Sequence, residues 1–302
     1  MLESIDATAI TATEYLPFLS NIWEHTKSIA NSNFTAALAG ALGGALAAQR
    51  IAERGKIKDE ITKELHNVNS ALALSVSCAS LSMALKKQHI KALKDSYDKD
   101  IKNFETYKID RRNGETDQPF TLIADLKTLN KISPPIAIIL DIVMNRLSMA
   151  GRGIAAAAAL SDYIENLNDV ILRRNELIDS FKNNRLPEGA KFEDLYLGLP
   201  YGNNQTNNEY GDTVSAIHLY TNDIIFFSAI LCEDLQEHAA TLNRTYKKIL
   251  SRTPPSSSKA DFSEARKNGF IPSNAEYEPW LSGFPRKTQI KLTWWQRITS
   301  RS

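Results

Sequence analysis

The sequence has little cysteine and no excess of either charge, and both shortages narrow the possible classes of protein. Its two cysteines, Cys78 and Cys232, lie far apart in separate apolar runs, so they form no disulfide framework. This usage is typical of a reducing compartment and predicts a cytosolic body. The 36 basic and 35 acidic residues nearly cancel to a net charge of +1, so no global field favours nucleic acid as a partner.

The motifs of the common enzyme classes are also missing. There is no Walker A loop, no GxGxxG after a strand, no CxxC pair, no HExxH and no GxSxG. No glutamate has a histidine three residues after it, which excludes the di-metal carboxylate site of helical bundles. We therefore predict a non-enzymatic protein and assign no catalytic, cofactor-binding or metal-binding residue, while a small-molecule ligand stays open.

One cluster is the best remaining candidate for metal binding or for an unfamiliar active site. It consists of Cys232, Glu233, Asp234, Glu237 and His238. Asp234 and His238 share a helical face and could bind a metal together with groups from elsewhere in the chain. His238 also falls on an apolar seam, where a histidine is more often part of the core. We interpret the cluster as structural.

The N-terminus lacks the positively charged start of a secretory signal, because residues 1–33 are mildly acidic and contain only Lys27 as a basic residue. Apolar residues between Ala12 and Ile29 have the spacing of one short amphipathic helix. This helix would contact either a membrane interface or the protein's own core.

The sequence is organised around a long predicted helix from Phe34 to Tyr107. Its first part, residues 34–49, carries no charge. Small residues recur there at every fourth position, which is the pattern by which helices pack closely inside membranes. These helix-packing residues are Ala36, Gly40, Gly44 and Ala48.

Residues 34–49 are the candidate membrane anchor, although they are short for a span of about 20 apolar residues. The positive-inside rule favours a single pass with the N-terminus outside and a cytoplasmic body. Its basis is a group of basic residues directly after the anchor, with almost none before it: Arg50, Arg54, Lys56 and Lys58. The alternative is a cytoplasmic protein in which the Ala/Gly face packs against a neighbouring soluble helix.

After the anchor, apolar residues step by three or four from Ile57 to Phe104, which predicts a sustained helical seam. The seam passes through a second uncharged stretch, residues 71–85. Four serines interrupt this stretch, so we interpret it as the core of a bundle. The alternative is a second span, which would make the protein a membrane-perturbing effector that inserts two apolar helices.

A turn near Gly114, a short extended piece at 120–124 and a short helix at 125–132 precede a second long helix, predicted from Pro134 to Asn183. Gly151 and Gly153 lie inside this helix and indicate close packing or bending. We interpret its polar run Arg173, Arg174 and Asn175 as ordinary surface chemistry.

A connection from Asn184 to Gly211, rich in proline, glycine and asparagine, leads to the third long helix, which Asp212 could cap. A loop of this length is often mobile or used for binding. The middle of the third helix is apolar nearly all round at residues 224–231. It should therefore lie at the centre of the bundle.

A tail begins at Thr253 and contains one predicted short helix, residues 261–267, with Gly269 as its stop. Its last part is basic and aromatic, which suits lipid headgroups or a partner groove. The predicted contact residues are Trp294, Trp295, Lys287, Lys291 and Arg297.

Together these patterns predict an all-α protein: an elongated antiparallel bundle of three long helices with coiled-coil-like packing, preceded by an Ala/Gly-rich possible transmembrane helix. The predicted segments are residues 1–33, 34–49, 50–252 and 253–302. The arrangement is typical of bacterial proteins with a membrane helix before a helical cytoplasmic domain. We expect a membrane-associated interaction or scaffold protein that binds lipid and either self-associates or binds a helical partner. Its alternatives are the two-helix effector and a soluble helical-bundle binding protein.

Overall fold

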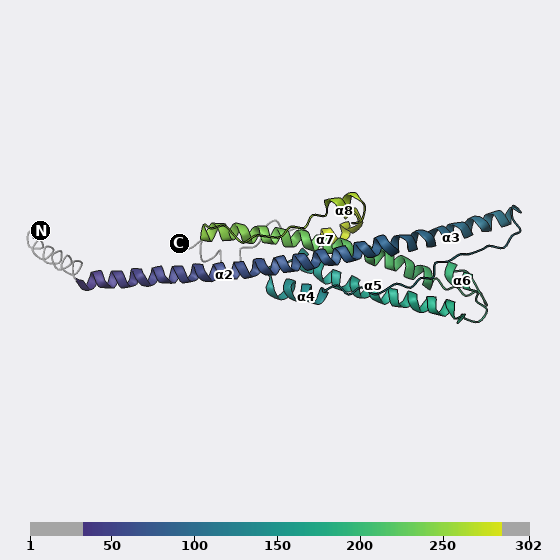
Figure 1. The fold of residues 1–302 in the computed structure, drawn as a ribbon, viewed down its shortest axis with the longest axis horizontal. Coiled ribbons are helices and arrows are strands. Elements are labelled where there is room, and N and C mark those ends of the chain that lie inside the picture. Colours follow the sequence, from purple (N-terminus) through teal and green to yellow (C-terminus); the bar gives the residue numbers. More distant parts are fainter. Residues whose placement is uncertain (1–32, 286–302) are drawn as a thin grey trace, which may run out of the picture. The chain divides into compact units, whose positions relative to one another are not determined.

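The protein is all-α in the computed structural model, which describes residues 33–285 (Figure 1). The described residues form no β-strand, and their one β-bridge joins Tyr201 to Gln205. The elements are α2 (Asn33–Leu85), the π-helix η1 (Lys86–Ile90), α3 (Lys91–Arg112), α4 (Ile136–Asp141), the π-helix η2 (Ile142–Arg146), α5 (Arg152–Lys182), α6 (Phe192–Leu197), α7 (Glu209–Leu250), α8 (Ser263–Lys267), the 3₁₀-helix η3 (Asn274–Tyr277) and α9 (Glu278–Gly283). Both the predicted fold class and the packing of long helices are confirmed.

Contacts within the chain define two units, Met1–Glu60 and Ile61–Ser302. Helix α2 contributes residues 33–60 to the first unit and residues 61–85 to the second. In the first unit, every residue from Gly40 to Lys56 is exposed. The predicted amphipathic helix between Ala12 and Ile29 lies outside the described residues.

The second unit is built around α7. The start of α5 meets the later part of α7 through the ion pair of Arg152 with Asp234, and Arg174 farther along α5 meets Tyr210 at the start of α7. These pairings make α5 and α7 antiparallel neighbours (Figure 1). Residues 224–232 of α7 are all buried, as expected for the centre of the bundle.

The first long helix of this unit, formed by α2, η1 and α3, also runs antiparallel to α7. His238 meets Glu64 in α2, and Tyr210 meets Tyr97 in α3. Consequently α5 runs parallel to α2 and α3, and α7 runs antiparallel to all three. Residues 115–135, which form no helix, make the return.

This return segment contradicts the short helix predicted at 125–132. Asn175 on α5 donates its Nδ2 to the Leu129 carbonyl (2.7 Å) and accepts the Leu129 N–H (3.0 Å). Asn168 makes the same pair of bonds with Ile132, both at 2.9 Å. Three extended residues span about 10 Å, which matches the rise of seven helical residues. The side-chain amides of Asn168 and Asn175 therefore make hydrogen bonds to backbone groups that a helix would have paired within itself.

The predicted continuous helix from Pro134 to Asn183 is broken into α4, η2 and α5. Leu147 is extended, and Gly151 has φ 78° and ψ −124°, a conformation that a side chain would strain. Gly153 gives close packing, since a Cβ there would lie 2.6 Å from the Met149 sulfur. The two glycines thus bend the chain and admit a neighbour, as their presence indicated.

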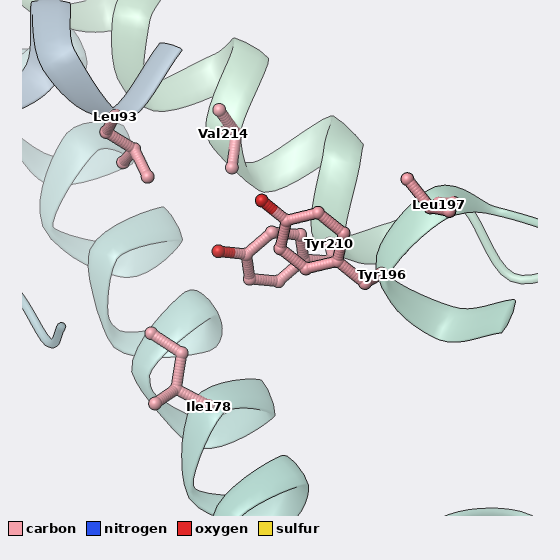
Figure 2. Close-up of a cluster of buried hydrophobic side chains, with 6 residues drawn as sticks. All are labelled: Leu93, Ile178, Tyr196, Leu197, Tyr210 and Val214. Carbon is pink, nitrogen blue, oxygen red and sulfur yellow. The ribbon is translucent and has the colours of Figure 1, made fainter. Parts of the chain in front are cut away.

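Helix α7 begins at Glu209, three residues before the predicted cap Asp212. The connection before it contains α6, whose Leu195, Tyr196 and Leu197 are buried. Figure 2 shows the rings of Tyr196 and Tyr210 against each other, with centroids 4.7 Å apart. The apolar part of this connection is therefore used inside the bundle.

Residues 253–285 also dock on the bundle. Asn69 of α2 binds the Ser256 carbonyl (3.1 Å) and the Ser258 N–H (2.8 Å). Farther along, Ile271 packs on Ile225 and Ala229 of α7. The predicted helix at 261–267 is confirmed as α8, and Gly269 ends it with φ 70°.

Candidate functional site

The first candidate site is the exposed apolar part of α2. Three leucines there are half or more exposed: Leu38 (50%), Leu42 (58%) and Leu46 (61%). A water-soluble helix normally places a row of leucines against a core. No described residue gives this row such cover.

The leucines and the small residues lie on opposite faces of the helix. Each residue of an α-helix is rotated by about 100° from the last, so a shift of two positions turns about 200°. The row of Leu38, Leu42 and Leu46 is offset by two positions from Gly40, Gly44 and Ala48. One face thus offers bulky apolar groups, and the opposite face allows close approach of another helix.

The dimensions of this segment are near those of a bilayer. Residues 33–49 would be about 25 Å long in a straight helix, slightly less than the hydrocarbon core of about 30 Å. The uncharged sequence itself begins earlier, at Ser28. The basic residues Arg50, Arg54, Lys56 and Lys58 follow and are all exposed.

The glycines of this segment have free space around them. A Cβ added at Gly40 or Gly44 would meet nothing within 4 Å. No described part of the chain therefore uses the small-residue face. The side chain of Ala36, the first predicted member of the row, is not among those that the structure describes.

The second uncharged stretch, residues 71–85, has a different environment. Ala71, Cys78 and Ala79 are fully buried, and burial raises the pKa of the Cys78 thiol. By length and composition, both the helix from Gly40 to Arg112 and α7 could cross a membrane. In α7, however, 61% of the apolar window is buried inside the bundle, as in the core helix of a soluble protein.

A polar cluster joins α2, the segment before α5, α5 itself and α7, and we define it as Glu64, Ser148, Arg152, Asp234 and His238. Asp234 and His238 are buried, Glu64 and Arg152 are partly buried, and Ser148 is exposed. Glu64 Oε1 accepts bonds from the Ser148 N–H (2.6 Å), the Ser148 hydroxyl (2.7 Å) and His238 Nε2 (2.8 Å). Arg152 Nε donates to Asp234 Oδ2 (2.9 Å). The cluster holds the break before α5 against the other two helices.

The cluster contains the residue types of a hydrolase triad in the wrong order. Burial opposes ionisation of Glu64, but the bonds from His238 and Ser148 outweigh it and hold the pKa of the carboxyl below its ordinary value. In a working triad the imidazole stands between hydroxyl and carboxylate. Here the carboxylate accepts from both groups, so the imidazole is not aimed at the Ser148 hydroxyl, and the arrangement favours a structural role.

The predicted alternative metal cluster is engaged in internal contacts. His238 bonds to Glu64, Asp234 pairs with Arg152, and Glu233 accepts a bond from Arg266 (2.6 Å). Among the described residues, no group of three or more His, Cys, Asp or Glu side chains is placed to hold a metal ion. The structural interpretation of this cluster is the one that these contacts support.

Sequence reasoning missed the role of Arg174, which was assigned to surface chemistry. Arg174 is 1% exposed, donates to the Lys127 carbonyl (2.8 Å) and to the Tyr210 hydroxyl (3.2 Å), and so ties the return segment to α7. Its neighbour Arg173 does lie on the surface, where it pairs with Glu209 and Glu176. The helical phase of the two arginines was the available signal, since Arg174 follows the buried Leu167 by seven residues.

The predicted contact residues of the tail, Trp294, Trp295, Lys287, Lys291 and Arg297, lie outside the described residues. Comparisons with family models, with curated proteins and with solved structures found no match to this chain.

Proposed function

We propose that this chain is a non-enzymatic helical interaction protein, held at a membrane by the first part of α2. The observation that carries the proposal is the exposed, uncharged leucine row at Leu38, Leu42 and Leu46. Lipid would cover this row, as no described residue does. The bundle of the second unit would then lie on the side of the basic residues, which the positive-inside rule assigns to the cytoplasm.

The same geometry supports self-association. With the leucine row toward lipid, the face of Gly40, Gly44 and Ala48 would face away from it and could meet the same face of a second copy. In this arrangement the protein is a scaffold whose bundle is displayed in pairs at the membrane surface.

The effector alternative is less well supported. Insertion of residues 71–85 would have to separate Ala71, Cys78 and Ala79 from the bundle, where they are fully buried. It would also expose the polar groups of Ser75 and Ser82 to lipid, at a cost for each group. The anchor needs no such rearrangement.

The test is an alkaline carbonate wash of membranes from cells that produce the full chain. We expect the wild-type protein to stay in the membrane pellet. A Leu42→Asp, Leu46→Asp variant should be released, because an Asp at the centre of a span costs about 2.5–3.5 kcal/mol. The matched control is Leu172→Asp, Leu219→Asp, which changes two leucines that are comparably exposed on the bundle (44% and 57%). This control should stay in the pellet.

Release of the wild-type protein would overturn the membrane proposal. If that released protein bound a helical partner or a second copy in solution, the soluble binding protein would be the better description. Retention of all variants would show that the leucine row is not what holds the chain to the membrane.

A further inference from the structure

The basic residues after the anchor are not evenly distributed around α2. Arg50, Arg54 and Lys58 are separated by four residues each, and we call them the basic face. In an α-helix each such step turns about 40°, so the three side chains span an arc of about 80°. The fourth basic residue, Lys56, lies on the other side of the helix.

The acidic residues of the same segment lie outside the arc of the basic face. Glu53, Asp59 and Glu60 each lie about 100° or more from the centre of its arc. Glu53 accepts a bond from Gln49 (2.9 Å). No ion pair among the described residues neutralises a member of the basic face, and all three side chains are exposed. The face is therefore a local positive surface in a chain of net charge +1.

The basic face also continues the leucine row. Arg50 stands four residues after Leu46, so the row changes from leucine to arginine in one helical step. Ile51, 72% exposed, lies two turns before Lys58 at nearly the same angle around the helix, and it adds an apolar group at the edge of the same arc. Long basic side chains near the end of a span reach toward the headgroup layer while their stems stay on apolar surface.

We propose that Arg50, Arg54 and Lys58 bind the headgroups of anionic phospholipids in the leaflet next to the bundle. The inference rests on the proposed membrane anchor and adds lipid selectivity to it. Its basis is charge complementarity, because three uncompensated positive groups meet the membrane where phosphate and other anionic groups are concentrated. Each basic residue near an anionic surface should contribute about fivefold to the partition coefficient, and the three together about a hundredfold.

The experiment measures partition of the full chain, diluted from detergent, into floating vesicles at low salt. The two probes are vesicles of phosphatidylcholine alone and vesicles of equal parts phosphatidylcholine and phosphatidylglycerol. We expect wild type to bind both, with a gain of about a hundredfold for the anionic vesicles that high salt largely removes. The Arg50→Gln, Arg54→Gln, Lys58→Gln variant should keep its binding to neutral vesicles and lose most of this gain.

The matched control is Lys87→Gln, Lys99→Gln, Lys102→Gln, which removes the same charge from exposed positions of the bundle. It should retain the gain. Equal partition of wild type into both vesicles, or an equal loss in the control, would overturn the lipid inference and leave the anchor proposal intact. Failure of wild type to float with either vesicle would overturn the anchor proposal, and the inference with it. Circular dichroism checks that the variants keep their helix, which glutamine supports about as well as lysine.

Discussion

Residues 40–49 and residues 61–82 of α2 both carry few charged side chains, but they differ in burial. In residues 40–49 every residue is exposed, whereas residues 61–82 supply Leu65, Val68 and Leu72 to the core. The difference lies in what the rest of the chain provides. Helix α7 and residues 253–285 cover the second part, and no described segment covers the first. An apolar helix alone does not reveal whether its partner is protein or lipid.

The largest expected effect is the difference in stability loss between a leucine-to-alanine change in the buried part of α2 and the same change in its exposed part. Leu65→Ala removes a side chain that is 1% exposed and should destabilise the bundle by about 2–5 kcal/mol. Leu42→Ala should change the free energy of unfolding by less than about 0.5 kcal/mol, since that side chain has no cover. Denaturant unfolding followed by circular dichroism measures both. Equal losses would mean that residues 33–60 are packed against protein.

A second pair of variants compares Glu64, in the polar cluster, with Glu53, in the exposed part. Because the pKa of Glu64 is lowered from 4.5 in the folded state, its stabilising effect is present above that pH and is lost as the pH falls through the folded pKa. Glu64→Gln should therefore cost about 1.5–3 kcal/mol at neutral pH and little at strongly acidic pH. Glu53→Gln should cost little at either pH. A pH-independent cost at Glu64 would contradict this assignment.

Glycine substitutions give a third comparison. A Cβ at Gly211 would overlap the Tyr97 hydroxyl, so Gly211→Ala should destabilise the bundle by about 1–3 kcal/mol. Gly44→Ala meets nothing within 4 Å and should leave the bundle unchanged while favouring the helix by up to about 1 kcal/mol. Thermal unfolding of the two variants measures the difference, and a destabilising Gly44→Ala would reveal a contact that the structure does not contain.

The smallest expected effect concerns the small-residue face of the anchor, formed by Gly40, Gly44 and Ala48. Gly44→Ile should weaken self-association of the full chain in detergent roughly tenfold, about 1.4 kcal/mol, because it prevents close approach of a second helix. Ala45→Ile, one position away and also exposed, is the control and should leave the association constant unchanged. Analytical ultracentrifugation measures the constants. A monomeric wild type, or equal losses in both variants, would argue against pairing through this face.

Much of the fold could be predicted from periodicity. The seam from Ile61 to Leu93, the buried middle of α7 and the stop at Gly269 all follow from local residue patterns, and the structure agrees with them. The return segment could not be predicted, because Asn168 and Asn175 satisfy its backbone from positions 36 and 46 residues away. The break before α5 was only indicated by its glycines, since helix propensity alone permits an occasional glycine.

In the candidate site, too, some features could be predicted from the sequence and others could not. The uncharged segment, the fourfold spacing of small residues and the basic residues after them are properties of the sequence itself. The polar cluster required the fold, since Glu64, Ser148 and His238 come from separate parts of the chain. Likewise, only the packing of Arg174 revealed that it is a buried connector and not a surface residue.

By itself, the sequence determined where helices form and which of their faces are apolar, because helix geometry converts spacing directly into faces. The tertiary structure decided which of those faces are covered. It placed residues 61–85 against α7 and left residues 40–56 exposed, although both belong to α2. Cover depends on contacts between residues far apart in the chain, and local spacing carries no information about them.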